Sequence, residues 1–530
     1  MNFILKNGFL IALSLMVATG CSGPTKNVKT PNILFIMSDD HAYQAISAYG
    51  HPIGQLAPTP NIDRLAAEGM VFENMFVANS ICGPSRAAII TGKFSHKNGF
   101  RNNGDMFDAD QPTLPKYLKE AGYQTAVVGK WHLKSSPQGF DYWCVLPGQG
   151  HYYNPDFLTP EDTIRIEGYV TDIITDLAID WLDQQRDPAK PFLLLYQHKA
   201  PHREWLPAEE YLDFYHGVTF PEPSSLFDTH ENMGAAAREA EMLISEHMAL
   251  SSDNKIHPDI VEEKGFKPFL RWYPNAYHNN LDRMNLEQRA NWESVYGPMN
   301  DEFESDTPEG DDLVRWKYQR YLQDYLACIK SVDDNVGRIL DYLKEQGLDQ
   351  NTIVVYTSDQ GFYLGEHGWF DKRFMYEESF RTPLLIRYPQ MVAPGTKATK
   401  MVQNIDFAPT FLKLAGLEIP DDMQGVSIIP ILKGEDPENW RTSLYYHYYE
   451  FPSIHMAKRH YGIRTDRYKL IHFYNDIDEW ELYDLQADPS EITNLINHSD
   501  YQDIKNDLKH HLDSLMVLYE EPPIETWRNE

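Results

Sequence analysis

The chain has 530 residues, of which 42 % are hydrophobic and 13 % are aromatic, a composition typical of globular proteins. Because one hydrophobic core rarely serves so long a chain, we expect two domains. The formal charge of −31 argues against nucleic-acid binding as the main task, since neutralising phosphates requires a basic surface.

The first residues have the pattern of an export signal. A basic residue precedes a short apolar run over residues 9–17, which ends in Ala18-Thr19-Gly20-Cys21. The run is too short for a membrane-spanning helix, and the small residues before the cysteine resemble the bacterial lipoprotein cleavage box. We therefore predict a signal peptide over residues 1–20, a lipid on Cys21 as the only membrane contact, and a polar tether over residues 21–30. The alternative is an ordinary secretory signal cut nearby. In both cases we expect an exported bacterial protein, in the periplasm or on the outer membrane or cell surface.

Four apolar runs predict strands that are buried on both faces of a sheet. They cover residues 31–37, 124–128, 191–196 and 352–357. Helical patterns occur at residues 59–69 and 113–122. Strands that alternate with helices predict an α/β sandwich built on a mixed sheet. Polar residues follow all four strands. Because open α/β sheets bind ligands at the carboxyl ends of their strands, we expect these polar residues to form one active-site rim.

The remaining chain is less regular. Residues from about 215 to 312 are rich in charged residues, Met and Asn and have few strand signals, so we interpret them as a partly helical insertion in a domain that spans residues 31–415. From residue 416 the pattern changes, with runs typical of antiparallel strands at 461–465, 468–473 and 481–485. We expect residues 416–530 to form a smaller domain, an antiparallel sheet with a C-terminal helix packed on it.

A divalent metal site is predicted from the residues that follow two of the strands. Asp39 and Asp40 follow the first strand, and Asp359 and Gln360 follow the last. Three carboxylates and an amide oxygen are hard donors, which suit Ca²⁺ or Mg²⁺ better than a thiolate-seeking ion. Asp39 and Asp40 alone would indicate a helix cap, but the second pair makes a metal site the better interpretation.

The most informative motif is Cys82-Gly83-Pro84-Ser85-Arg86, followed by Thr91-Gly92. A buried free cysteine at a helix start is the ordinary interpretation of Cys82. The whole stretch, however, resembles the signature of type I sulfatases, C-x-P-S-R followed by an aliphatic residue and Thr-Gly. The resemblance implies that a formylglycine-generating enzyme oxidises Cys82 to formylglycine (3-oxoalanine), which also contacts the metal. In that family one hydroxyl of the hydrated aldehyde attacks sulfur, and the other expels the sulfate.

The same resemblance implies which cations bind the sulfate, whose charge must be neutralised in the transition state. Arg86 lies four residues after Cys82 and would hold the formylglycine. Lys130 belongs to Gly-Lys-Trp-His, which resembles the second signature of the family. Lys372 matches the later family lysine that binds sulfate.

Histidines are the candidates for proton transfer, because histidine can supply a proton to the leaving alcohol near neutral pH. His198 and His202 both lie on the loop after the third predicted strand, in the sequence His-x-x-Pro-His. The resemblance favours His202 as the acid, with His198 second. His132 would accept a proton from the second hydroxyl, and the two roles could be exchanged.

The resemblance covers nearly the whole mature chain and implies an alkaline-phosphatase-like fold, with a large mixed, mostly parallel sheet flanked by helices and a smaller C-terminal domain. Residues 359–369 and 371–379 are similar to the N-acetylglucosamine-6-sulfatase branch. That branch removes the 6-O-sulfate from glucosamine units of heparan-type glycosaminoglycans. The expected substrate is therefore a sulfated mono- or oligosaccharide, and residues 445–460, dense in Tyr and His, are expected to contribute sugar contacts.

Three alternatives stay open. The chain could be another glycosaminoglycan sulfatase, such as an iduronate-2-O-sulfatase, although those often have a histidine where Gln360 stands. It could be a phosphonate or phosphodiester hydrolase of the same superfamily. It could also be an inactive glycan-binding lipoprotein, although no expected catalytic group is missing from the sequence. The sequence also leaves open whether Cys144 and Cys328 form a disulfide.

Overall fold

The computed structural model of the chain describes residues 30–267 and 275–529. The predicted signal peptide and Cys21 lie outside these residues. Among the helices that are described, none has both the length and the hydrophobicity needed to cross a bilayer.

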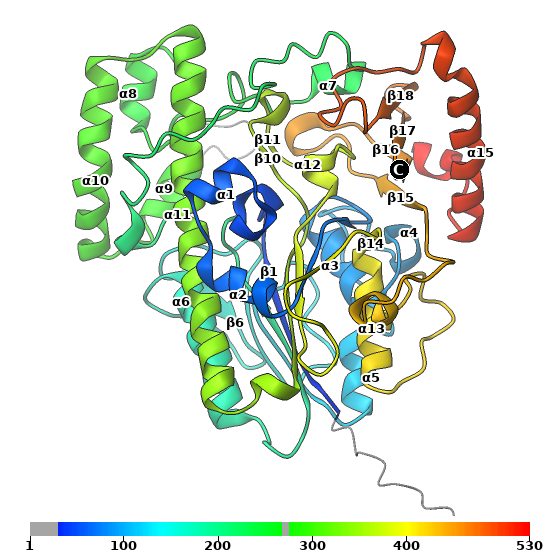
Figure 1. Cartoon of the computed structure of the whole chain (residues 1–530). Helices are drawn as coiled ribbons and strands as arrows, with labels where there is room; N and C mark the ends of the chain where they lie inside the picture. Colours follow the sequence, from blue (N-terminus) through cyan, green and yellow to red (C-terminus); the bar gives the residue numbers. More distant parts are fainter. Residues whose placement is uncertain (1–29, 268–274, 530) are drawn as a thin grey trace, which may run out of the picture.

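A ten-stranded mixed sheet forms the centre of the molecule (Figure 1). Its middle strands β9, β1, β8, β4 and β5 are parallel, and antiparallel pairings occur toward both edges. The four predicted strands are all present and adjacent. In spatial order the strands are β13 (Thr396–Ala398), β2 (Met70–Phe72), β12 (Leu384–Arg387), β9 (Thr352–Ser358), β1 (Asn32–Ser38), β8 (Phe192–Gln197), β4 (Gln124–Lys130), β5 (Tyr142–Leu146), β6 (Asp156–Leu158) and β7 (Thr163–Arg165).

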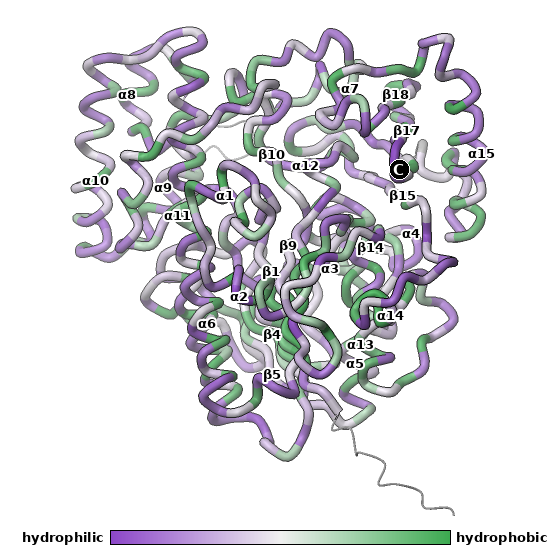
Figure 2. The backbone as a smooth tube through the Cα atoms, viewed as in Figure 1, coloured by the Kyte–Doolittle hydropathy of each residue, from purple (hydrophilic) through white to green (hydrophobic). Residues whose placement is uncertain are grey.

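Helices cover both faces of this sheet, so alternate residues of a central strand enter two separate cores. On β1, Leu34 and Ile36 belong to one core, and Ile33 and Phe35 belong to the other. Figure 2 shows hydrophobic residues concentrated on the central strands. The first core packs against α2 (Pro60–Glu68), α6 (Val170–Asp180) and α11 (Gly310–Glu345). The second packs against α3 (Cys82–Thr91), α5 (Leu114–Glu120) and α13 (Phe407–Leu414).

The predicted insertion consists of loops and helices that pack beside the long helix α11. Figure 1 shows α8 and α10 beside the upper half of α11, and Val261 and Phe303 form a small apolar core there. Within the described residues of the insertion, the α-helices that precede α11 are α7 (Ala235–Glu239), α8 (Pro258–Glu263), α9 (Ala276–Leu281) and α10 (Leu286–Ser305). Elsewhere, Cys144 on β5 and Cys328 on α11 are both buried free thiols, which answers the question about their pairing.

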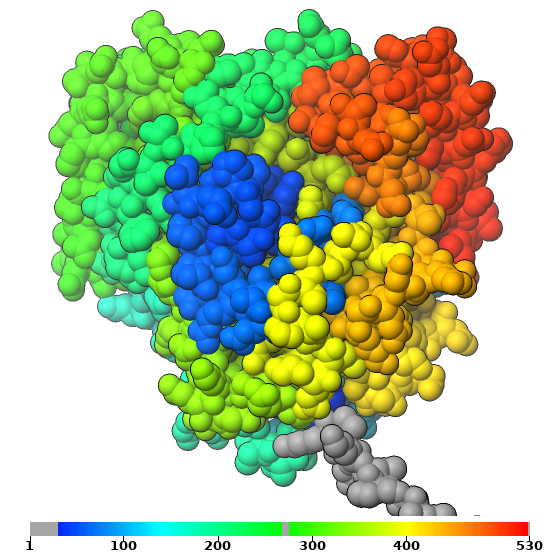
Figure 3. Space-filling view, viewed as in Figure 1, coloured from blue at the N-terminus to red at the C-terminus, as the bar shows by residue number. Residues whose placement is uncertain are grey.

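The C-terminal residues form a four-stranded antiparallel sheet covered by a helix, and they gather at one corner of the molecule (Figure 3). Three of the strands and the helix were predicted, whereas β15 was not. β15 is rich in Tyr and completely buried, because the domain of residues 31–415 covers one face of the sheet and α15 covers the other. The elements are β15 (Ser443–Tyr448), β16 (His460–Thr465), β17 (Tyr468–Phe473), β18 (Glu479–Asp484) and α15 (Gln502–Leu518).

Gly129, which precedes the last residue of β4, lies where no side chain fits. Its φ is 99°, and an added Cβ would collide with the backbone oxygen of Gln197 on β8. We expect Gly129→Ala to lower the free energy of unfolding by at least about 2 kcal/mol in guanidinium denaturation. Gly122→Ala is the matched control, because its φ is 89° but no atom lies within 4 Å of the added Cβ. Equal losses at both positions would contradict a role for the close approach of the two strands.

Candidate active site

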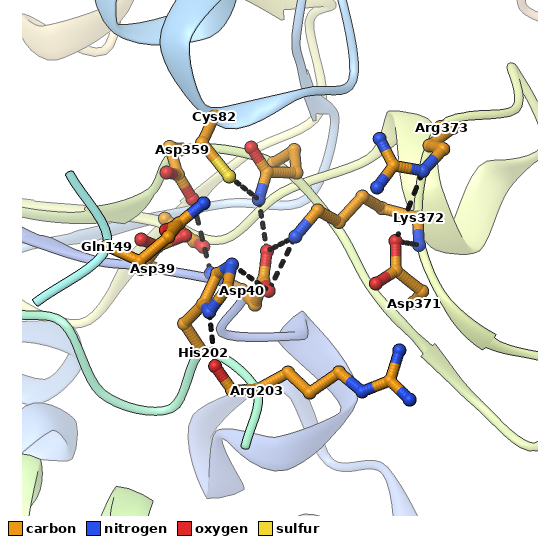
Figure 4. A network of polar contacts seen from close by, with 12 residues as sticks. Asp39, Asp40, Cys82, Gln149, His202, Arg203, Asp359, Asp371, Lys372 and Arg373 are labelled. Carbon is orange, nitrogen blue, oxygen red and sulfur yellow. Dashed lines mark hydrogen bonds and ion pairs between the residues drawn. The ribbon is translucent and has the colours of Figure 1, made fainter. Parts of the chain in front are cut away.

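The carboxyl ends of β1 and β9 lie side by side because the two strands are parallel neighbours. Asp39 and Asp40 directly follow β1, and Asp359 follows β9. One oxygen from each of these carboxylates lies within 4.8 Å of the other two, and all three side chains are fully buried. Figure 4 shows them converging with Cys82, Lys372 and His202. The structure thus brings together the three carboxylates that the sequence analysis selected.

This cluster fits a hard divalent cation. Burial raises the pKa of Asp40 to about 6, against the opposing effect of Lys372. In residues 30–267 and 275–529, Asp39 Oδ1 and Gln360 Oε1 are buried but accept no hydrogen bond, which is unusual for such atoms. The amide nitrogen of Gln360 donates to Asp40. Rotating the amide group by 180° would exchange its nitrogen and oxygen and place Oε1 on the side of Asp40. Four oxygen donors of this kind suit Ca²⁺ or Mg²⁺.

Cys82, the first residue of α3, lies beside the carboxylates with 1 % of its surface exposed. Its Sγ is 3.8 Å from Nε2 of Gln360. Cys82, Asp39 and His202 also form a second group of side chains whose potential metal-ligand atoms lie within 4.8 Å of one another. Burial raises the pKa of the Cys82 thiol to about 12. At neutral pH the unmodified side chain is therefore a neutral thiol and a weak nucleophile. Conversion to formylglycine would replace this weak nucleophile.

Three predicted cations surround the carboxylates: Arg86, Lys130 and Lys372. Arg86 binds Asp359 through Nε and Nη2, at 3.0 and 2.9 Å, and lies on the same face of α3 as Cys82. Lys130 contacts Asp39, and burial holds its pKa well below the usual range. Lys372 Nζ lies 2.7 Å from both carboxylate oxygens of Asp40. Burial opposes its charge, but Asp40 raises the pKa of Lys372 nonetheless.

The structure separates the three candidate histidines. His202 and His132 line the cavity described below, whereas His198 does not. His198 packs 4.4 Å from the ring of Tyr196, and burial lowers its pKa to about 3. His202 Nδ1 lies 2.5 Å from the backbone oxygen of Arg203, and its Nε2 lies 3.8 Å from Asp40 Oδ2. Burial and the nearby lysines also keep the pKa values of His202 and His132 well below the usual range. This placement favours His202 over His198 as the proton carrier.

A cavity of about 390 Å³ opens onto Cys82. Its wall combines residues from the domain of residues 31–415, from the insertion within that domain and from the C-terminal domain. Both acidic and basic side chains contribute to it. Besides Cys82, His132, His202 and Lys372, its lining includes Asn103, Gln149, His151, Lys199, Arg203, Glu204, Ala276, Asn279, Asn280, Asp371, Arg373, Glu450, Ile454 and His455. From the tyrosine- and histidine-rich segment 445–460, Glu450, Ile454 and His455 are thus the residues that reach the cavity, while the tyrosines of β15 are in the core.

Most of the additional lining residues were not selected from the sequence. Two signals were present: Asp371 and Arg373 flank Lys372, and Lys199 follows His198. The backbone of the folded chain also marks three of these residues as functional candidates, because Asp371, Arg373 and His455 have positive φ values of 82°, 107° and 67°. Strained conformations of non-glycine residues cluster at functional sites, but sequence alone does not reveal them.

Comparison with known proteins gives a consistent result. A family model described as "Sulfatase" matches residues 31–417, and one described as "N-sulphoglucosamine sulphohydrolase, C-terminal" matches residues 365–517. An N-acetylglucosamine-6-O-sulfatase of Bacteroides thetaiotaomicron is 49 % identical, over 97 % of this chain and 91 % of the relative. A solved structure of a protein in complex with its substrate D-glucosamine-2-N,6-O-disulfate has a TM-score of 0.88 and 48 % identity, covering 93 % of this chain and 99 % of that one. A phosphonate monoester hydrolase from Silicibacter pomeroyi, at 20 % identity and a TM-score of 0.66 over 93 % of this chain and 96 % of its own, shares the fold.

Proposed function

The chain belongs to the sulfatase family, and from this premise we propose that it hydrolyses the 6-O-sulfate ester of N-acetylglucosamine units in heparan sulfate or heparin fragments. As a sulfatase it is a sulfuric ester hydrolase, and its substrate is a sulfated sugar. The position of the sulfate and the identity of the sugar are inferred from the activity of the relative that is 49 % identical.

The observation that carries the proposal is the convergence of unlike groups around Cys82. Three carboxylates suited to one cation and three basic side chains surround Cys82, and Cys82 and Lys372 line the cavity. A sulfate ester is an anion, and negative charge builds up on its leaving oxygen as the S–O bond breaks. Arg86, Lys130 and Lys372 can neutralise the charge of the sulfate group in a buried site, and a proton from His202 can neutralise the leaving oxygen. A protein that only binds glycans would gain nothing from a buried nucleophile beside a metal site.

Sulfatases generally use formylglycine and a divalent metal. For this chain we propose Ca²⁺, with Mg²⁺ as the alternative, held by Asp39, Asp40, Asp359, Gln360 and the oxidised side chain of Cys82. When bound, the cation would acidify the attacking hydroxyl and draw charge from the sulfate oxygens. A formylglycine-generating enzyme would act on Cys82 before or during folding, because the side chain is buried in the folded chain.

We assign the proton transfers to His202 and His132. Nδ1 of His202 donates to the carbonyl of Arg203, which leaves Nε2 free to carry a proton to the leaving alcohol. Burial and, after it, nearby lysines lower the pKa of His202, and the negative charge of a bound sulfate ester would oppose the effect of the lysines and favour the protonated form. His132 would accept the proton of the second hydroxyl as sulfate is released. Export as a lipoprotein anchored through Cys21 completes the proposal.

Release of free sulfate tests the proposed function. The enzyme is co-expressed with a formylglycine-generating enzyme, and peptide masses verify the oxidation of Cys82 and report any lipid on Cys21. We expect kcat/KM for 6-O-sulfated N-acetylglucosamine to exceed that for 2-O-sulfated uronate disaccharides by at least roughly 100-fold. A fully oxidised enzyme that cleaved only the second substrate would contradict the specificity but not the family. Faster cleavage of aryl phosphate esters would instead favour the phosphonate or phosphodiester hydrolase alternative.

A further inference from the structure

Asp253, a residue of the insertion, holds one of the cations of the cavity although it is not part of the lining. Its carboxylate is fully buried and accepts two hydrogen bonds from Arg203, from Nε at 2.7 Å and from Nη2 at 2.6 Å. Arg203 itself lines the cavity. Because a bidentate pair constrains the plane of the guanidinium, Asp253 determines where the remaining nitrogen of Arg203 points.

That remaining nitrogen, Nη1, lies 3.3 Å from Nε2 of His455. The same Nε2 lies 3.2 Å from Asp371 Oδ2, so Arg203 and Asp371 compete for one ring atom. His455 Nδ1 lies 2.6 Å from the backbone oxygen of Glu241, which can only accept a hydrogen bond. Nδ1 therefore carries the proton of the neutral ring, and Nε2 accepts from Arg203. Burial lowers the pKa of His455, in agreement with a neutral ring.

The consequence concerns Asp371. While Nε2 of His455 accepts from Arg203, the neutral ring has no proton there for Asp371. Oδ1 of Asp371 accepts the backbone N–H of Lys372, and Oδ2 stays available as an acceptor in the cavity wall. If Arg203 moved away, His455 could take up a second proton and pair with Asp371. Sugar hydroxyl groups need acceptors of this kind, whereas the sulfate group needs the cations around Cys82.

We propose that Asp253 is a positioning residue for sugar recognition. By fixing Arg203 it sets the pattern of donors and acceptors that Arg203, His455 and Asp371 present to the hydroxyl groups of the substrate. The inference rests on the proposed function and extends it to the insertion.

The insertion holds Asp253 firmly in place. The carboxylate accepts the N–H of Ala249 at 2.8 Å, and Lys255 Nζ donates to the backbone oxygen of Asp253 at 2.9 Å. Lys317 of α11 in turn donates to backbone oxygens of the same loop, those of Ile244, Ser245 and Met248. The segment 244–255 is therefore fastened to the long helix, and this gives the insertion a structural role at the cavity.

The test is Asp253→Asn, which keeps the size of the side chain but removes its charge and one of the two acceptors. We expect the KM for 6-O-sulfated N-acetylglucosamine to rise about tenfold or more, with a much smaller change in kcat. The inhibition constant of inorganic sulfate, which probes the cations around Cys82, should not change. Calorimetry of the sulfated sugar in a Cys82→Ala background makes the same comparison without depending on turnover. Arg203→Lys should reproduce the effect, because a lysine cannot span Asp253 and His455 at once.

Asp406→Asn is the matched control, because Asp406 is also a buried carboxylate paired with an arginine, the partly buried Arg441, at 2.6 Å, but neither lines the cavity. This variant can lose stability but should keep the KM of the parent. The inference would be overturned if Asp253→Asn changed neither constant, or if KM and the inhibition constant of sulfate rose together. A parent enzyme that bound the sugar but released no sulfate would contradict the proposed function alone. No sugar binding by the Cys82→Ala parent would overturn both.

Discussion

Replacing Cys82 with alanine is expected to abolish sulfate release, with a fall in kcat of roughly 10⁴-fold or more. The loss should be this large because the replaced group is the nucleophile itself and no other residue can form the covalent intermediate. The carboxylates, Lys130 and Lys372 are contributed by other segments, and the exchange leaves Arg86 in its place on α3, so the site should still bind the substrate. The measurements are initial rates of sulfate release and, separately, the affinity for the sulfated sugar by calorimetry.

The fold should tolerate this change. Cys82 is the first residue of α3, and alanine is a good helix former that removes only the sulfur atom. Cys144→Ala is the matched control, because Cys144 is also a buried free thiol but lies on β5 in the core, and this variant should keep its activity. Turnover retained by Cys82→Ala would exclude Cys82 as the nucleophile. Serine is a less informative substitution, because some bacterial maturation systems also oxidise serine.

The sequence predicted four adjacent strands of the ten-stranded sheet, β9, β1, β8 and β4, because these are short apolar runs buried on both faces. Residues 31–37 and 352–357 could be recognised without any long-range information, and the rule that ligands bind at the carboxyl ends of such strands placed Asp39 and Asp359 in one site. β15 was missed because its Tyr-rich sequence also suits a binding surface. Only the packing of two domains shows that these tyrosines are core residues.

The sugar side of the cavity could not be predicted for a related reason. Arg203, Asp253 and His455 are far apart in the sequence, and each is an ordinary polar residue in an irregular segment. Their partnership depends on loops that meet only in the folded chain. Family motifs selected the groups that we expect to contact sulfate, because that chemistry is common to the family. The residues that we propose for sugar recognition lie on irregular segments, and no local pattern marks them.

Neutralising Asp39 is expected to remove the response of the protein to Ca²⁺. Asp39 contributes one of the three clustered carboxylates, and its Oδ1 accepts no hydrogen bond within the described part of the chain. For the wild type, Ca²⁺ at 100 times its dissociation constant should raise the free energy of unfolding by about 2.7 kcal/mol, through preferential binding to the folded state. Asp39→Asn should lose most of this gain and, with it, at least roughly 100-fold of kcat. Denaturation curves with chelator and with Ca²⁺ measure the first effect, and sulfate release measures the second.

The effect on the chelated protein decides whether Asp39 serves the metal or the fold. Without a cation, Asp39, Asp40 and Asp359 repel one another, although Lys130, Arg86 and Lys372 oppose this repulsion. Asp39→Asn relieves the repulsion but weakens the pair with Lys130, so the chelated variant should be about as stable as the chelated wild type. Asp333→Asn provides the contrast. Asp333 accepts two backbone N–H groups at the start of α2, so its loss should cost about 1 kcal/mol with and without Ca²⁺ and leave the Ca²⁺ response intact. A Ca²⁺ response of wild-type size in Asp39→Asn would exclude these carboxylates as the cation site, whereas a large loss of stability in the chelated variant would assign Asp39 to the fold.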